Sequence, residues 1–347
     1  MKTPECGRKI LLPVITLLVC LCSQVSAQDM HFSQFFEAPL LRNPSLAGLF
    51  TGDIRAQMVY RNQWNSITNA YKSGSFNVEY KMPVGKGDDF LTTGVQVLYD
   101  KAGTAGLTTT EVLPALNYHK SLSGNKTTYL SVGFMGGLVQ KSIDRSKVTT
   151  NAQYDGVAFN PALADGETFS NPTYDYFDGS VGASFNSAFG AEDANTYFIG
   201  LAYHHFNRPR NSFYRNAASA LNPKIVASGG MKFNIDENTF FTLQADYSNQ
   251  GNFNEAIAGA MYSVKVGEPD APQYIIHGGA FLRWKDAFIP VLKIDYNPFS
   301  VALSYDVNVS QLKTVSQGRG GVELSISYIG FLDRGNSTRD KVLCPHF

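Results

Sequence analysis

Apolar residues recur at every second position along most of the chain from about residue 52 onward, in short segments separated by Gly, Pro, Asn, Asp and Ser. A period of two predicts β-strands, because successive side chains of a strand point to opposite faces. The same alternation recurs in residues 54–61, 301–308 and 322–328. Residues 241–248 are a clear example, in which Phe241, Leu243, Ala245 and Tyr247 alternate with Thr242, Gln244, Asp246 and Ser248.

The ionised side chains help to distinguish the two architectures that alternating strands can build. Charges such as Arg55, Lys293 and Asp295 fall on the polar side of their segments, while the other side is aliphatic and aromatic. In a membrane barrel the polar side lines a wet lumen and the apolar side meets lipid. Segments such as 107–120 and 129–142 are longer than the usual 5 to 6 residues of globular strands and reach the roughly 9 to 11 that a bilayer requires. The chain is therefore predicted to be all-β, a transmembrane antiparallel up-and-down β-barrel.

About fourteen such segments are present, and bacterial single-chain barrels have an even number of strands. The longest connections, residues 143–175 and 207–223, are the fifth and seventh, whereas even-numbered connections such as 235–238 and 297–299 are brief. Successive turns alternate between the two ends of a barrel, and long loops are external in outer-membrane barrels. Both chain termini are therefore expected in the periplasm. The expected strands are approximately residues 52–63, 73–83, 91–100, 107–120, 127–142, 176–186, 196–206, 224–234, 239–249, 253–266, 273–284, 287–297, 300–308 and 318–331.

The amino-terminal residues have the order of a secretory signal peptide: basic residues, an apolar run over residues 10–21, then small or polar residues up to Ala27. The apolar run is shorter than the roughly 20 residues of a membrane-spanning helix, so cleavage after Ala27 is expected. Cleavage leaves Cys344 as the one cysteine of the mature chain, which excludes an internal disulfide. The expected organisation is a signal peptide over residues 1–27, an N-terminal lead-in segment over 28–51, the outer-membrane β-barrel over 52–331 and a periplasmic tail over 332–347.

Charge and motifs give no support for nucleic-acid binding or catalysis. A net charge of +0 provides no basic excess to neutralise phosphates. The sequence has no His-Glu-x-x-His, no Gly-x-Ser-x-Gly, no phosphate-binding Gly-rich loop and no EF-hand series. His204 and His205 are adjacent on a predicted strand, so they are expected to face opposite sides and not to bind a metal together. We therefore expect no enzymatic activity, no cofactor and no metal site.

Three sequence elements carry a resemblance to a known family. The N-terminal segment reads Gln-Asp-Met-His-Phe-Ser-Gln-Phe at residues 28–35 and Arg-Asn-Pro-Ser-Leu-Ala-Gly at residues 42–48. Tyr-Arg-Asn-Gln-Trp follows at residues 60–64, and the chain ends with Cys-Pro-His-Phe at residues 344–347. In this order the elements resemble the PorP/SprF family, outer-membrane proteins of the type IX secretion system of Bacteroidetes.

The resemblance implies an integral outer-membrane component that supports secretion or surface anchoring of large exported proteins, in some members gliding adhesins, through protein–protein contacts. Its implied partners are a secreted protein, bound through its C-terminal domain, and the periplasmic ring components of the secretion system, with outer-membrane lipid around the barrel. The alternative function is an outer-membrane transporter or porin for small or apolar solutes, since barrels of this size can carry a plug. The residues that the resemblance marks for partner binding are Phe32, Ser33, Gln34, Asn43, Pro44, Gly48, Cys344, Pro345 and Phe347.

The N-terminal elements also have a physical interpretation. Pro44 fixes its own backbone angle and biases Asn43 away from helix, so the chain is expected to turn before the first strand. Gly48 permits a further tight bend. The segment over residues 28–51 is thus expected to be a periplasmic lead-in or a lumen plug, or a docking surface for periplasmic partners, and these roles are compatible.

A second group of residues, on the first two strands, is expected at the lumen or the membrane interface. Tyr60 and Trp64 suit the membrane boundary, where an aromatic ring can keep one edge wet. Arg61 falls on the polar side, so it is expected in the lumen, where a buried guanidinium needs a carboxylate. Glu79, on the neighbouring strand, is the expected partner of Arg61, and Gln63 belongs to the same sequence element.

Overall fold

The computed structural model describes residues 29–63, 71–85, 88–123, 127–169, 171–214, 219–310 and 312–332. The expected signal peptide lies outside the described residues, and so do Trp64, Cys344, Pro345 and Phe347. Within the described ranges, no helix combines the length and the apolar character that crossing a membrane would need.

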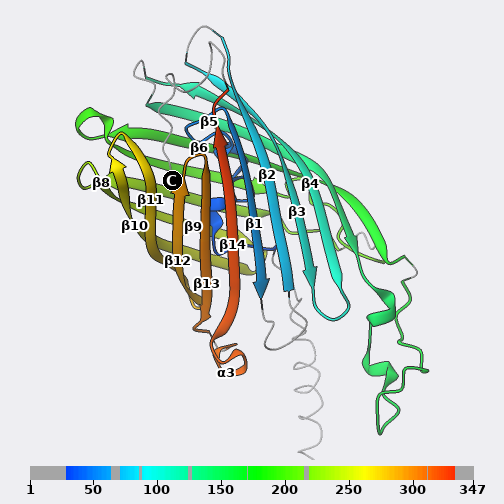
Figure 1. Cartoon of the computed structure of the whole chain (residues 1–347). Helices are drawn as coiled ribbons and strands as arrows, with labels where there is room; N and C mark the ends of the chain where they lie inside the picture. Colours follow the sequence, from blue (N-terminus) through cyan, green and yellow to red (C-terminus); the bar gives the residue numbers. More distant parts are fainter. Residues whose placement is uncertain are drawn as a thin grey trace, which may run out of the picture.

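The described strands form one closed antiparallel barrel (Figure 1). Each strand pairs with its neighbours in the sequence, and β1 closes the barrel by pairing with β14. The predicted up-and-down barrel of fourteen strands is therefore confirmed over the described residues. The strands are β1 (Ile54–Gln63), β2 (Tyr71–Pro83), β3 (Phe90–Ala102), β4 (Leu107–Ser121), β5 (Thr128–Ser142), β6 (Thr173–Phe189), β7 (Asn195–His204), β8 (Lys224–Asn234), β9 (Thr239–Gln250), β10 (Phe253–Glu268), β11 (Ala271–Arg283), β12 (Ala287–Tyr296), β13 (Phe299–Asn308) and β14 (Arg319–Gly330).

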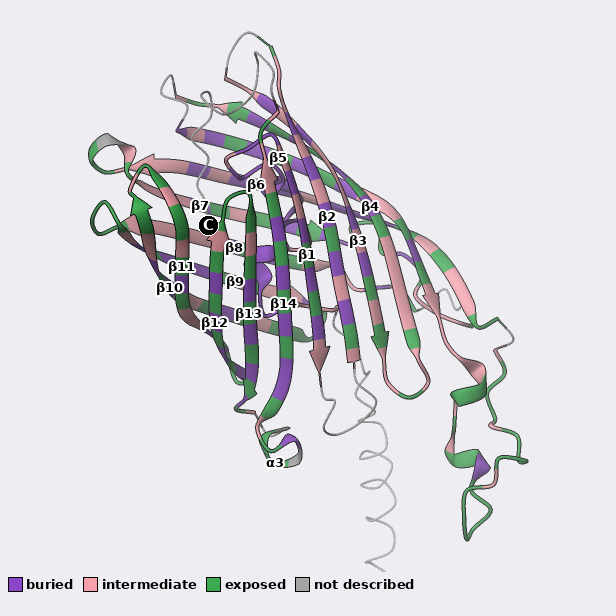
Figure 2. Ribbon diagram, viewed as in Figure 1, coloured by how far each residue is buried: buried purple, intermediate pink, exposed green. Residues whose placement is uncertain are grey.

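Burial alternates along the strands as predicted, which Figure 2 shows as bands of buried and exposed residues. On β1, Met58 and Tyr60 are exposed on the outer surface, whereas Arg55, Gln57 and Arg61 are buried inside. The outer surface of the whole barrel carries aliphatic and aromatic side chains in this way. A soluble monomer rarely exposes an apolar surface of such extent, so lipid is the environment that fits it.

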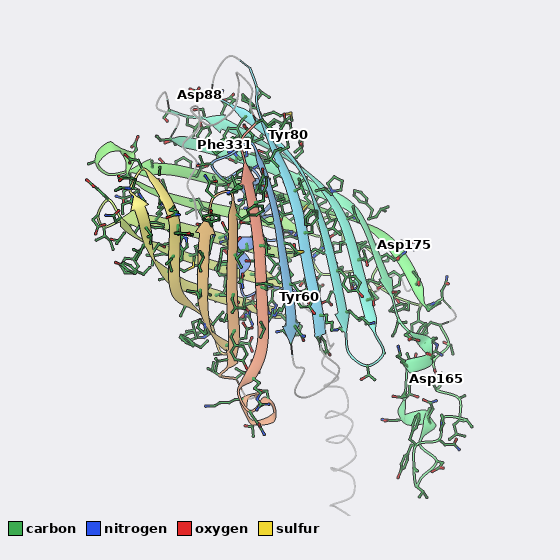
Figure 3. All side chains as sticks on the ribbon, viewed as in Figure 1. Tyr60, Tyr80, Asp88, Asp165, Asp175 and Phe331 are labelled. Atoms are coloured by element: carbon green, nitrogen blue, oxygen red, sulfur yellow. The ribbon has the colours of Figure 1, made fainter. Side chains whose placement is uncertain are left out.

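The two ends of the barrel differ in their connections. The connections are numbered in chain order, so that the first joins β1 to β2. We call the end with the odd-numbered connections the odd end. The opposite end, where β1 begins and β14 finishes, is the even end. The two long connections, residues 143–172 and 205–223, share the odd end as predicted (Figure 1). In Figure 3, Asp165 and Asp175 accordingly lie at the end opposite to Asp88 and Phe331. The fifth connection is shorter than expected, because β6 already pairs with β5 from Thr173 onward.

Residues 29–53 lie inside the barrel (Figure 1), and we call this segment the plug. It contains the short helices η2 (Phe35–Glu37), α2 (Pro39–Arg42) and η3 (Pro44–Leu46). This segment was expected to be a periplasmic lead-in or a lumen plug, and its described residues form a plug.

The plug crosses the lumen from one end to the other. Asp29 contacts Gln250 and His205 at the odd end, whereas the Asp53 N–H donates to the carbonyl of Gly330 at the even end. The described chain thus begins at the odd end, whereas β1 begins and β14 finishes at the even end. The two termini, which were both expected in the periplasm, lie outside the described residues.

Apolar side chains of the plug pack against inward-facing residues of the wall, so the core lies between the plug and the barrel. The three main clusters lie on different sides of the plug, which therefore contacts the wall in several directions. They contain Phe35 and Phe36 with Met261 and Phe281; Leu40 and Ala47 with Leu113 and Met135; and Phe32 and Ala38 with Val59 and Leu98.

Candidate functional site

Glu323 on β14 holds the first turn of the plug. Its carboxylate oxygens accept hydrogen bonds from the backbone N–H groups of Ser33 and Gln34, each at 2.7 Å. The Gln34 side-chain amide donates in turn to the carbonyl of Glu323 at 2.9 Å and to the Ser304 hydroxyl at 3.0 Å. Hydrogen bonds to a charged acceptor are about twice as strong as neutral ones. The buried residues Ser33 and Gln34 thus bind the barrel's own wall.

Arg61 lies in the lumen as predicted and is 1% exposed. Its Nη2 lies 2.9 Å from Oδ2 of Asp306, and its Nε lies 3.1 Å from Oε1 of Glu323. The guanidinium also donates to the carbonyl oxygen of His31. Arg61 therefore joins three segments that are far apart in the sequence: β1, the β13–β14 pair and the start of the plug.

The expected partnership between Arg61 and Glu79 is wrong. Glu79 pairs with Arg55, whose Nη2 lies 2.8 Å from Oε1. Arg55 and Glu79 are direct partners in the register of β1 and β2, whereas Arg61 lies six residues farther along, about 20 Å at the usual rise of a strand. All three residues share the lumen face, so alternation alone could not choose between the two arginines. Glu79 also anchors the plug, because it accepts the Gly48 N–H at 2.8 Å.

The Asn43–Pro44 turn has the structure that its residues predict. The Asn43 side chain caps η3 by accepting the Ser45 N–H at 2.9 Å, and Pro44 is the first residue of that helix. The wall has glycines where this turn approaches it. A Cβ at Gly182 would lie 1.9 Å from Oδ1 of Asn43, and one at Gly133 would lie 2.5 Å from the carbonyl carbon of Pro44.

Gly48 makes the further bend that was predicted. Its φ of +83° is one that side-chain-bearing residues rarely adopt, and a Cβ there would lie 2.0 Å from Oγ1 of Thr92. The glycine is therefore required both by the backbone conformation and by the close approach of the plug to β3.

Two more ion pairs between the plug and the wall were missed by the sequence reasoning. Arg42 binds Asp246 on β9 through two hydrogen bonds, of 2.6 and 2.8 Å. Lys293 on β12 lies 2.8 Å from Oε1 of Glu37. The sequence did contain a signal for these pairs, namely the charged residues on the lumen side of the strands, such as Asp246 and Lys293. A charge buried in a filled lumen needs a partner of opposite charge.

His204 and His205 both face the lumen, so the expectation of opposite faces is wrong. β7 ends at His204, and His205 has a φ of +56°, which interrupts the strand alternation. His205 lies between two carboxylates, with Nδ1 2.7 Å from Asp178 and Nε2 2.6 Å from Asp29. Burial alone would lower the pKa of His205, but the two carboxylates raise it to about 10. In the part of the chain that the structure describes, no group of three or more potential metal ligands is arranged to hold an ion.

The remaining predicted residues do not form one site. Phe32 is buried and packs against Val59 and Leu98. Tyr60 is 43% exposed and points outward from the barrel (Figure 3). Gln63 is the last residue of β1 and is half-buried, and Trp64 lies outside the described residues.

The plug does not fill the even end completely. A cavity of about 540 Å³ remains there, and we call it the vestibule. Phe36 and Phe50 of the plug form one side of it, and inward-facing residues such as Phe240 and Met261 form another. Lys232, Lys293 and His277 bring charged or polar groups to the same space.

The long connection over residues 143–172 has a structure of its own and projects from the odd end (Figure 1). Nη1 of Arg145 lies 2.8 Å from Oδ2 of Asp165, and its guanidinium stacks over Phe169. A bridge between Tyr154 and Phe159 closes a turn that presents apolar side chains to the surroundings, among them Val157, which is 88% exposed.

Comparison with solved structures finds similar chains. The toluene transporter TbuX of Ralstonia pickettii is 8% identical, with a TM-score of 0.52 over 85% of this chain and 94% of that one. A FadL homologue of Pseudomonas aeruginosa is 10% identical, with a TM-score of 0.47 over 84% and 94% of the two chains. CdiB from Acinetobacter baumannii is 10% identical, with a TM-score of 0.44 over 80% of this chain but 60% of that one. The likeness to TbuX shows the fold alone.

Comparison of sequences is more specific. No curated protein matches the chain significantly. A family model described as type IX secretion system membrane protein PorP/SprF matches residues 24–328. The matched range contains the plug, β1 to β13 and most of β14. The chain therefore belongs to the PorP/SprF family of type IX secretion system membrane proteins.

Proposed function

We propose that this outer-membrane barrel supports the secretion or surface anchoring of large exported proteins through protein–protein contacts, and that it does so without catalysis. The observation that carries the proposal is the plug. Residues 29–53 occupy the lumen and are held by buried ion pairs to β9 and β12 and by hydrogen bonds to Arg61 on β1 and Glu323 on β14. A barrel whose lumen holds its own N-terminal segment leaves no wide channel for a solute or an unfolded chain. It therefore acts through the folded surfaces that it presents to partner proteins.

The lengths of the connections support one orientation of the barrel in the membrane. Outer-membrane barrels carry long loops outside the cell and short turns in the periplasm. The odd end, with residues 143–172 and 205–223, is then extracellular. The even end, where β1 begins and β14 finishes, faces the periplasm and the ring components of the secretion system.

The surface for the exported protein is the connection over residues 143–172. Its fold is braced internally by Arg145 and Asp165, so its tip is held in a defined shape. Tyr154, Val157 and Phe159 there are 57%, 88% and 51% exposed. Exposed apolar groups on a braced loop are typical of protein interaction sites.

Affinity capture from the native organism tests the proposal. The full-length protein is purified in mild detergent, and the bound proteins are identified by mass spectrometry. We expect an exported protein and secretion-system components in the wild-type sample, and loss of the exported protein from a Val157→Ser/Phe159→Ser variant.

A matched control is Val309→Ser, which removes an exposed apolar side chain from another connection at the same end. We expect this variant to retain the exported protein. Recovery of neither an exported protein nor a secretion component with the wild-type barrel contradicts the proposal.

The second candidate function is transport of small or apolar solutes, and the vestibule is the observation that favours it. A transporter with an open route would conduct ions or admit solutes when reconstituted in planar bilayers. The plugged lumen leads us to expect no conductance beyond that of the lipid alone.

A further inference from the structure

The vestibule has an apolar surface where a barrel lumen is usually polar. Phe240 on β9 and Met261 on β10 point inward, and Phe36 and Phe50 of the plug face the same space. Apolar surface in contact with water costs about 25 cal/mol for each Å² that remains uncovered. Packing between plug and wall covers most of this surface, since Phe36, Phe50, Phe240 and Met261 are 6%, 1%, 4% and 2% exposed, and the cavity of about 540 Å³ adjoins what remains.

One cation at the vestibule has no carboxylate partner among the described residues. The ammonium of Lys232 lies 4.2 Å from the centre of the Phe240 ring, and the described residues give it no ion pair. The other cationic or ionisable groups that line the vestibule on β1, β11 and β12 are paired. Lys293 lies 2.8 Å from Glu37, Arg55 lies 2.8 Å from Glu79, and His277 lies 2.9 Å from Asp295.

Asp295 lines the vestibule and attracts Lys232 electrostatically, but it forms its ion pairs with His277 and Lys293 and none with Lys232 among the described residues. Lys265 donates to the carbonyl oxygens of Glu237 and Pro269 and adds positive charge. Asp270 borders the vestibule from the turn between β10 and β11, and it forms no ion pair with Lys232. A buried or half-buried ammonium over an aromatic ring is therefore available to an anion that enters from the even end.

We propose that the vestibule binds a small amphiphile with one carboxylate and an apolar chain. The carboxylate pairs with the Lys232 ammonium, and the chain lies on Phe240, Met261 and Phe36. Of the described lysines that line the vestibule, Lys293 is paired with Glu37 and Lys232 has no ion pair, so one compensating charge is available, which favours a monocarboxylate over a dianionic head group. The volume lies within the roughly 300–1,000 Å³ of small-molecule sites, which combine apolar surface with polar groups that orient the ligand.

Equilibrium dialysis with decanoate as the probe tests this site. The full-length protein is reconstituted in lipid nanodiscs, and protein-free nanodiscs measure the decanoate that partitions into lipid. We expect the protein to bind decanoate in excess of the lipid, and to bind it more tightly than decanol and decyltrimethylammonium. Lys232→Met keeps the apolar stem and should weaken decanoate binding by about tenfold or more, with little effect on decanol.

Three further variants make the result specific. Lys232→Arg should restore most of the affinity for decanoate, and Phe240→Ala should weaken decanoate and decanol alike. Lys313→Met, on helix α3 (Leu312–Ser316) at the odd end, removes an exposed lysine far along the barrel and should change neither.

Two results overturn the proposal. One is wild-type protein that binds decanoate no better than decyltrimethylammonium. The other is a folded Lys232→Met barrel that retains the wild-type affinity for decanoate. If Lys232→Met does not fold, the affinities of the wild-type protein for decanoate and decyltrimethylammonium still test the proposal.

Discussion

Substitution of Arg61 by Met tests whether buried charge holds the plug and the barrel together. Arg61 is 1% exposed and forms ion pairs with Asp306 and Glu323 at 2.9 and 3.1 Å. Methionine keeps most of the apolar stem but removes the guanidinium. Two buried carboxylates then remain, and one of them, Glu323, binds the plug backbone at Ser33.

The expected cost can be estimated from the partners that remain. Removing one member of a buried ion pair typically costs about 3–5 kcal/mol, because the other charge stays desolvated. Arg283 lies 3.3 Å from Asp306 and continues to compensate that carboxylate. We therefore expect Arg61→Met to lower the free energy of unfolding by about 3 kcal/mol, the lower end of that range. In the Arg61→Met/Glu323→Gln double variant the loss should be smaller than the sum of the single losses, because the two residues interact directly.

Denaturant titration of the barrel in lipid vesicles measures these differences, with the folded fraction read from the electrophoretic shift of folded barrels. The matched control is Lys120→Met, which breaks an ion pair of 2.8 Å with Asp89 at a lysine whose side chain is 56% exposed. Exposed pairs contribute little, so the control should behave as wild type. If Arg61→Met were as stable as Lys120→Met, the buried network would not be what holds the plug.

Three further predictions concern the plug and the orientation of the barrel. Gly182→Ala places a Cβ where the plug touches the wall, so it should displace the plug and produce ion conductance in planar bilayers. The control is Gly278→Ala, whose new Cβ has no atom within 4 Å and which should produce no conductance. The pKa of His205 is raised from its usual 6.5 to about 10. The protonated imidazole therefore contributes its full stabilisation of the folded state below about pH 6.5, and this stabilisation is lost as the pH rises through about 10. Protease sensitivity at the start of the plug should therefore increase between about pH 8 and about pH 11 in wild type, and much less in His205→Gln. In a background that lacks the native cysteine, Val157→Cys should react with a membrane-impermeant maleimide on intact cells, while Glu237→Cys, in an exposed turn of the even end, should react only after permeabilisation.

The barrel can be predicted from local sequence pattern. Strand positions, the number of strands and the lipid and lumen faces all follow from a local alternation of apolar and polar residues, and each segment carries that information without its neighbours. The shared end of the two long connections follows as well, because connection parity depends only on counting strands. The prediction for Arg61 shows where such reasoning ends. The lumen side was predicted correctly, because alternation along one strand defines the side to which a residue points. The partner was predicted wrongly, because the register between strands defines which residues meet.

The role of the N-terminal segment as a plug becomes visible when the whole barrel is folded. Its motif residues were visible in the sequence, yet their role depends on Glu79, Asp246, Lys293 and Glu323, which come from four strands and meet the plug only when the barrel closes. His205 belongs to the same class, because one positive φ turned it inward against the strand pattern. Contacts between residues hundreds of positions apart depend on barrel closure and register, and the alternation of a single strand carries no information about either.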